Sequence, residues 1–108
     1  MVGAAILVLT QMPDQASAQA LARFLLEAHL AACVSVGAPV QSLYHWRGQI
    51  ETAQEIPVTV KTRSERYAEV EAAIRAQHPY ELPEIIAVPI IDGYAPYLDW
   101  IADAAACR

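Results

Sequence analysis

The strongest constraint on the fold is a stretch of alternating residues in the middle of the chain. It follows Arg47-Gly48, a dipeptide typical of a tight hairpin turn. Apolar and polar side chains then alternate, with Ile50, Ile56, Val58 and Val60 on one face and Glu51, Glu55, Thr59 and Lys61 on the other. Such period-two alternation predicts a strand with one face on a core. Because Pro57 cannot donate a ladder hydrogen bond, we expect a bulge or an unpaired stretch there.

The two strands of this hairpin are unusually long. They run over about Ala32–Trp46, interrupted at 37–39, and Glu51–Thr62, against a usual length of ~5–6 residues. A ribbon of this length must project beyond a small domain or pair with something. Because a long exposed edge strand is a hazard unless another chain covers it, the sequence predicts self-association, for which closed cyclic symmetry is the usual form.

The remaining periodicities predict an α+β domain. A strand over Ala4–Thr10 precedes a helix that Asp14 caps and that runs through about His29. Further along, Ser64 is expected to cap a second helix, which has Tyr67, Val70 and Ile74 as its apolar stripe and ends at or before His78. A strand over Glu84–Ile91 should follow. The last helix should start near Pro96 and bury Tyr97, Leu98 and Ile101.

This order of elements is that of a ferredoxin-like βαββαβ sandwich with a long hairpin between its second and third strands and an extra C-terminal helix. With 108 residues, the chain is expected to form a single domain, residues 1–108. The helices should cover one face of the sheet. The other face should stay open and carry Glu55, Thr59 and Lys61.

Composition excludes several classes of protein. A hydrophobic content of 56% excludes a disordered tail. The formal net charge of −5 and seven scattered basic residues argue against nucleic acid as a partner. Neither a basic amphipathic helix nor an apolar run of ~20 residues is present, so no membrane partner is expected. The two cysteines do not make a disulfide framework, and we expect a cytoplasmic protein with reduced thiols.

Chemically useful side chains gather in the segment from His78 to Glu84, which two prolines make rigid. It holds one imidazole, one phenol and two carboxylates, those of Glu81 and Glu84. A rigid connector of this kind can aim ligands at a site. It can equally be a plain linker whose polar groups are satisfied locally. Cys33 offers a thiolate for a soft metal ion, or it is a small hydrophobe in a strand. The motifs HExxH, CxxC and His-x-His are absent.

Two further groups of residues each allow more than one interpretation. Tyr44, Trp46, Tyr97 and Trp100 are aromatic residues that either anchor an interface or stack a ligand. Glu55 and Lys61 lie six positions apart, roughly 20 Å at ~3.3 Å per residue. They cannot pair with each other within the strand, so each needs another partner if this face is covered. A nucleophile pair of Cys33 and His78 is conceivable, but the sequence has neither a Gly-rich phosphate loop nor a Gly-x-Ser-x-Gly elbow.

Five segments together resemble the CutA family of divalent-cation tolerance proteins. They are AACVSV at 31–36, SLYHWRGQIE at 42–51, the Glu55 and Lys61-Thr62 positions, HPYELPEI at 78–85, and the Gly93, Tyr97, Leu98 and Trp100 pattern. The matches run in order from about residue 6 to residue 101. Ser35 stands where the family usually has Asn, and His45 where another aromatic residue is common.

The resemblance implies a homotrimer with an architecture similar to that of the PII signalling proteins, and ligand clefts between its subunits. It implies a metal-binding function, with copper or another divalent cation as the ion, Cys33 as thiolate ligand, and His78 and Glu81 as nitrogen and oxygen ligands. The residues matched to the cleft are Tyr44, Trp46, Glu55, Lys61, Tyr80 and Trp100. No organic cofactor and no catalytic residue is expected.

Two other functions stay open at this stage. One is a PII-like sensing or scaffolding trimer that holds a small anion through Lys61, with Tyr44 or Trp46 stacking on it. The other is an enzyme that uses Cys33 or His78. The sensor needs no thiol, so Cys33 is the residue that separates it from the metal-binding trimer.

Overall fold

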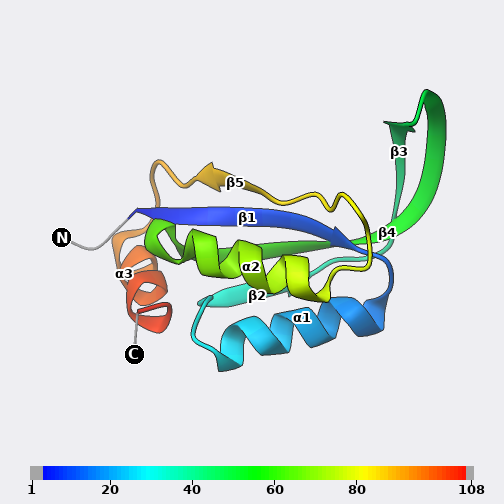
Figure 1. Ribbon diagram of the computed structural model, residues 1–108. Helices are drawn as coiled ribbons and strands as arrows, with labels where there is room; N and C mark the ends of the chain where they lie inside the picture. Colours follow the sequence, from blue (N-terminus) through cyan, green and yellow to red (C-terminus); the bar gives the residue numbers. More distant parts are fainter. Residues whose placement is uncertain (1–3, 107–108) are drawn as a thin grey trace.

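The computed structural model describes residues 4–106, which form one antiparallel sheet and three α-helices (Figure 1). The elements are β1 (Ala5–Met12), α1 (Gln15–Glu27), β2 (Cys33–Val36), β3 (Val40–Trp46), β4 (Gln49–Arg63), a 3-10 turn (Ser64–Arg66), α2 (Tyr67–Gln77), β5 (Ile86–Pro89) and α3 (Ala95–Ala104). The sheet order is β2-β4-β1-β5, with β3 paired to the other half of β4. This is the ferredoxin-like arrangement that the order of elements predicts, with α3 as the extra helix.

The strand β4 changes partner at Pro57. Val36 of β2 pairs with Val58, whereas Val40 of β3 pairs with Glu55, so the register slips by one residue between them. On the other side of β4, pairing with β1 continues unbroken through Pro57. The unpaired stretch expected at Pro57 is therefore confirmed on one edge. Gly37 is needed there, because a Cβ atom would lie 2.8 Å from the Pro57 ring.

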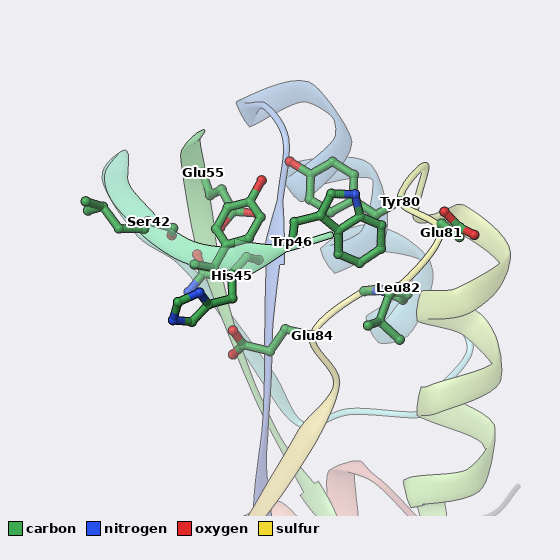
Figure 2. A pocket seen from close by; sticks show the side chains of 12 residues that line it. Ser42, His45, Trp46, Glu55, Tyr80, Glu81, Leu82 and Glu84 are labelled. Carbon is green, nitrogen blue, oxygen red and sulfur yellow. The ribbon is translucent and has the colours of Figure 1, made fainter. Parts of the chain in front are cut away.

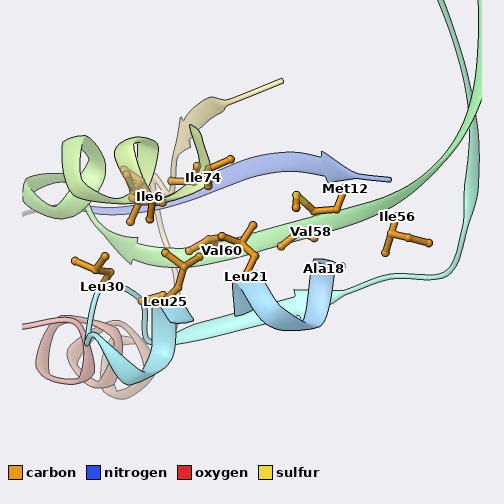
Figure 3. Close-up of a cluster of buried hydrophobic side chains, with 14 residues drawn as sticks. Ile6, Met12, Ala18, Leu21, Leu25, Leu30, Ile56, Val58, Val60 and Ile74 are labelled. Atoms are coloured by element: carbon orange, nitrogen blue, oxygen red, sulfur yellow. The ribbon is translucent and has the colours of Figure 1, made fainter. Parts of the chain in front are cut away.

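The core lies between the sheet and the helices α1 and α2 (Figure 3). Val58 and Val60 of β4 and Val8 of β1 meet Leu21 and Leu25 of α1 within one buried cluster. Asp14 caps α1 as predicted, since its carboxylate accepts a hydrogen bond of 2.8 Å from the Ser17 N–H. The helix α3 lies at the opposite face of the sheet, near one end of β4 and β1 (Figure 1).

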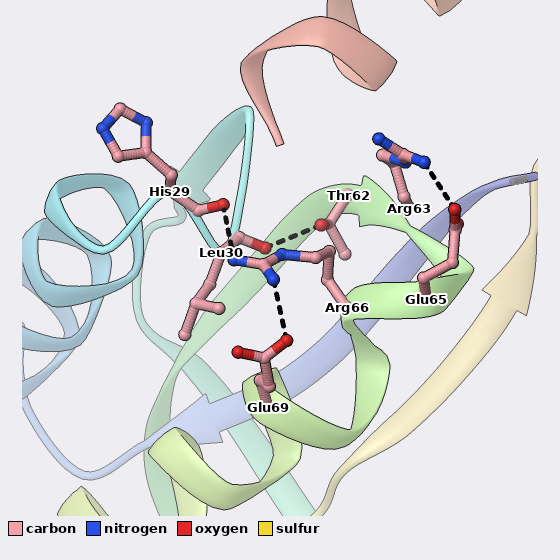
Figure 4. Close-up of polar contacts among 7 residues, drawn as sticks. All are labelled: His29, Leu30, Thr62, Arg63, Glu65, Arg66 and Glu69. Carbon is pink, nitrogen blue, oxygen red and sulfur yellow. Dashed lines mark hydrogen bonds and ion pairs between the residues drawn. The ribbon is translucent and has the colours of Figure 1, made fainter. Parts of the chain in front are cut away.

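Buried polar contacts join β4 to the end of α1 (Figure 4). The Thr62 hydroxyl donates to the Leu30 carbonyl at 2.6 Å. The buried Arg66 guanidinium donates to the His29 carbonyl at 3.2 Å and to the Glu69 carboxylate at 2.8 Å. The His29 backbone has a φ of 57°, so these bonds hold a left-handed turn that few non-glycine residues adopt.

Three predictions about local structure are wrong. Ser64 does not cap α2; it begins the 3-10 turn, and α2 starts at Tyr67 with no side-chain cap. The last strand covers only Ile86–Pro89, because Pro89 ends the ladder and the residues before Ile86 form a loop. Tyr97 is exposed rather than buried, and within α3 the fully covered position is Ile101.

The part of the hairpin beyond Glu55 projects from the body of the molecule; we call β3 with residues 49–54 of β4 the arm (Figure 1). Its tip is a tight turn in which both Arg47 and Gly48 have positive φ. No layer covers the arm within the described residues, so Leu43 is 64% exposed and Ile50 71% exposed. The expectation that Ile50 shares the core face is therefore wrong.

Candidate functional site

A pocket of about 780 Å³ lies between the arm and the loop that follows α2 (Figure 2). Side chains from both segments line it: Gln11, Ser42, Leu43, Tyr44, His45, Trp46, Glu55, Tyr80, Glu81, Leu82, Pro83 and Glu84. The pocket joins five of the residues predicted from the sequence, namely Tyr44, Trp46, Glu55, Tyr80 and Glu81. It also recruits residues with no earlier assignment, above all Gln11 and Glu84.

His78 positions this loop. The residue follows α2 in an extended conformation, and its ring is buried. The Tyr80 N–H donates to His78 Nδ1 at 3.2 Å, so Nε2 carries the proton and donates to the Gln11 carbonyl. The two rings also contact each other at a tilt of 55°, with centroids 4.6 Å apart. Because both ring nitrogens are engaged, His78 acts in this structure as a support for Tyr80.

Negative charge dominates the inside of the pocket. The side chain of Glu55 is turned into it and only 8% of the residue is exposed. Burial, followed by the charge of Glu55, raises the pKa of Glu84. Burial, followed by the charge of Glu55 and a hydrogen bond to it, likewise raises the pKa of Tyr80. Both shifts show that the environment disfavours adding further negative charge.

The rim of the pocket carries the one ion pair of this region that the structure records. The Arg47 guanidinium lies 3.1 Å from the Glu81 carboxylate, and both side chains are largely exposed. The same guanidinium lies 5.3 Å from the centre of the Trp46 ring. The arm tip and the loop are thus tied together by a cation that touches both a carboxylate and an aromatic face.

The other predicted site residues lie towards the opposite end of the sheet. Cys33 of β2 pairs with Lys61 of β4, and directly opposed residues point to the same face. The Lys61 ammonium donates to the Tyr97 hydroxyl at 3.3 Å, and Tyr97 stacks on Trp100 at 5.4 Å. Lys61 and Trp100 are therefore not part of the pocket formed by Tyr44 and Trp46.

The structure does not gather the three predicted metal ligands. Cys33 is a partly exposed free thiol on β2, His78 is engaged in two hydrogen bonds, and Glu81 pairs with Arg47. Within residues 4–106, no group of three or more His, Cys, Asp or Glu side chains is arranged to hold a metal ion. Cys107 lies outside the described residues.

Sequence reasoning missed Gln11 because the predicted first strand ended at Thr10, whereas β1 continues to Met12. Glu84 stood within the segment singled out from the sequence but was assigned to a strand. Its place in the pocket depends on the shorter β5.

Comparison with known proteins settles the family. Residues 6–104 match the family model described as CutA1 divalent ion tolerance protein. The chain belongs to the CutA1 family. It is 38% identical over 96 residues to the divalent-cation tolerance protein CutA of Thermus thermophilus, covering 89% of this chain and 93% of that protein. With the longer CutA homologue of Xenopus laevis it shares 41% identity over 91 residues, which is 84% of this chain and 60% of that protein.

A solved CutA1-family structure has the same fold. The protein described as the periplasmic divalent cation tolerance protein CutA of Archaeoglobus fulgidus superposes with a TM-score of 0.91 at 40% identity, covering 94% of this chain and 99% of that one. The relatives from Thermus thermophilus and Archaeoglobus fulgidus are named for divalent-cation tolerance, which connects this CutA1-family chain to that process in general terms. None of the helices formed by residues 4–106 is long and apolar enough to cross a bilayer.

Proposed function

We propose that this protein acts in divalent-cation tolerance as a homotrimer that binds a divalent or soft metal ion, with copper as the expected ion. The observation that carries the trimer is the arm. The side chains of Leu43 and Ile50 are well exposed on it, although a stable fold gains by removing such side chains from water. The arm also presents the free edge of β3, to which another strand can pair.

Metal binding in this proposal joins donors from more than one subunit. Cys33 supplies the thiolate, because it is free and lies partly exposed on β2, at an edge of the sheet. Glu81 supplies a carboxylate by exchanging its Arg47 partner for the ion, since an exposed ion pair is weak. His78 supplies an imidazole only if its ring leaves Gln11 and Tyr80, so we expect its contribution to be the smallest of the three.

Copper binding isotherms on four variants test this assignment. Cys33→Ser should lower the affinity most, Glu81→Gln should lower it less, and His78→Ala should change it least. Cys107→Ser controls for nonspecific capture by thiols and should bind copper as the unmodified protein does. Isotherms of Cys33→Ser that match those of the unmodified protein would show that the ligand assignment is wrong.

A second function is favoured by the pocket itself. We propose, as the alternative, a PII-like sensing or scaffolding trimer whose small-molecule ligand lies beside Tyr44, Trp46 and Glu55. A volume of about 780 Å³ falls within the range of organic ligand sites, about 300–1,000 Å³. Lys61 is not among the lining residues, so an anion held by Lys61 would lie elsewhere. Lys61→Ala should therefore leave binding in this pocket intact.

Catalysis and compartment are part of the same proposal. We assign the protein no turnover, and pH-dependent turnover that is lost in Cys33→Ser or His78→Ala would refute this. We place the protein in the cytoplasm, where Cys33 stays reduced. Cell fractionation with markers for each compartment tests that placement, and recovery with periplasmic markers would contradict it. Nucleic acid and membranes are not proposed as partners, given the net charge of −5.

A further inference from the structure

We infer that the pocket between the arm and the loop after α2 binds a small organic cation, an ammonium compound held between the Glu55 and Glu84 carboxylates and the aromatic rings of the arm. This inference rests on the second proposed function, because it names the chemical class of the small molecule that the sensing trimer would bind. Binding itself depends on residues that a single protomer already brings together (Figure 2).

The first argument is charge. Three carboxylates line the pocket and no Lys or Arg does. Glu81 is paired with Arg47 at the rim. Among residues 4–106, no ion pair is recorded for Glu55 or Glu84, although Glu55 is almost fully buried. A buried carboxylate without a cation is costly, so a ligand that brings a positive charge stabilises the site.

The second argument is an unused acceptor. The Oε1 atom of Gln11 is buried, belongs to a residue that lines the pocket, and has no hydrogen-bond partner in the structure. A buried acceptor without a donor costs free energy. A primary ammonium group has three N–H donors and no acceptor, whereas a quaternary ammonium group has no N–H donor. A primary ammonium can therefore donate to a carboxylate and, with a turn of the Gln11 side chain that exposes Oε1, to this acceptor as well.

The third argument is the aromatic wall. Tyr44, Trp46 and Tyr80 all line the pocket, and the ring contact with His78 supports Tyr80. The faces of such rings attract cations. The protein's own Arg47 already shows this pairing at the rim, where its guanidinium lies over Trp46 and beside Glu81. The ligand's positive charge would lie deeper in the pocket, likewise beside both a carboxylate and an aromatic ring.

Size separates an organic cation from a bare metal ion. A cavity of about 780 Å³ holds a molecule of many atoms, whereas a metal ion needs several donors within about 2.0–2.6 Å. The described residues supply no group of three or more suitable side chains for that purpose. The pocket therefore fits a cation that carries its own carbon skeleton and fills the space between the rings.

Calorimetric titration of the assembled protein with chosen probes tests the inference. The probes are choline, its uncharged isostere 3,3-dimethylbutan-1-ol, the diamine putrescine and, as inorganic cations, Mg²⁺ and Cu²⁺. We expect choline or putrescine to bind saturably and the uncharged isostere not to bind. Saturable binding of the isostere at the same strength, or of neither organic cation up to about 10 mM, would overturn the inference.

Matched variants locate the binding. Glu55→Gln and Glu84→Gln should each lower the affinity for the organic cation by about ten-fold or more. Glu84 lies in a partly exposed loop, so its variant keeps the test valid even if Glu55→Gln disturbs folding. Glu27→Gln, an exposed site at the end of α1, should bind as the unmodified protein does. Equal affinity in all three variants would place the cation elsewhere and contradict the inference.

The outcomes are distinguishable from failure of the proposed function. Choline binding by a protein that sediments as a protomer would refute the trimer and leave the cation site standing. A trimer that binds copper but no organic cation would refute the cation site alone. Binding of Mg²⁺ or Cu²⁺ that displaces choline and is lost in Glu84→Gln would assign the pocket to a metal ion instead.

Discussion

The two halves of β4 belong to one continuous strand and lie in opposite environments. From Ile56 to Thr62, every second side chain is buried against α1 and α2. From Gln49 to Gln54, all residues except Ala53 are exposed, and Ile50 stands open to solvent. The difference lies in whether a second layer covers the strand. Alternation of side chains therefore shows that a strand has two distinct faces, but what covers each face depends on the rest of the assembly.

A pair of isoleucines on this one strand gives the largest expected contrast. Ile56 is 3% exposed in the body, and Ile50 is 71% exposed on the arm. Ile56→Ala should lower the free energy of unfolding by about 2–5 kcal/mol because it leaves a cavity, and this loss should not depend on protein concentration. Ile50→Ala should instead show a loss that grows on dilution, since it weakens contacts between copies. Urea unfolding at several protein concentrations measures both.

Two arginines extend the comparison to ion pairs. Arg66 is buried and donates to the His29 carbonyl and to Glu69, whereas Arg47 is exposed and pairs with Glu81. Arg66→Ala should cost about 1.5–3 kcal/mol, because it removes a charged donor from the partly buried hydrogen bonds to the His29 carbonyl and Glu69. Arg47→Ala should cost about 0–1 kcal/mol, as exposed ion pairs do. Denaturant midpoints that fall equally in both variants would remove the contrast between body and arm.

Two threonines of β4 give a smaller contrast. The buried Thr62 hydroxyl donates to the Leu30 carbonyl, while Thr52 is exposed on the arm. Thr62→Val keeps the shape of the side chain but leaves that carbonyl without its donor, at a cost of about 1–2 kcal/mol. Thr52→Val should stay within about 0.5 kcal/mol, as most surface substitutions do. Thermal unfolding of the two variants at one protein concentration provides the check.

Glu84 gives the smallest effect, and it depends on pH. Burial raises the pKa of folded Glu84 above its ordinary value of 4.5. Folded protein thus binds this proton more tightly, so stability falls as pH rises from the ordinary pKa through the raised one. Glu84→Gln should flatten that fall and slightly raise the melting temperature at pH 7 in the absence of amines. Glu51→Gln, on the arm, is the control, and a pH profile altered equally by both variants would contradict this account.

The architecture could be predicted from the sequence because local signals determine it. The order of strands and helices, the Asp14 cap and the turn at Arg47 all depend on residues close together in the chain. Family resemblance added the correct family, while the loop after α2 stood out by its residue types alone. Membership of the pocket was less predictable. Whether Glu55 lies near Glu84 or near Lys61 depends on where the loop after α2 crosses the sheet. The spacing of apolar residues in the sequence does not predict that position.

The errors about burial and about the pocket share one physical cause. Ile50 and Tyr97 have the side chains of buried residues, yet each lies where this protomer provides no covering layer. Gln11 and Glu84 look like ordinary surface residues, yet the fold brings both to the pocket. Burial is a property of tertiary and quaternary contacts, so it can be read from a single strand only when a layer of the same chain is known to face it.

Sedimentation equilibrium tests the central claim, that the arm is exposed because it is built to pair with other copies. The account predicts a particle of three times the 11.8 kDa chain mass, and a shift towards the protomer mass in Leu43→Asp, where the charge lies on the arm. Leu26→Asp, at an exposed position of α1, should leave the mass unchanged. A mass of about 11.8 kDa for the unmodified protein would contradict the account.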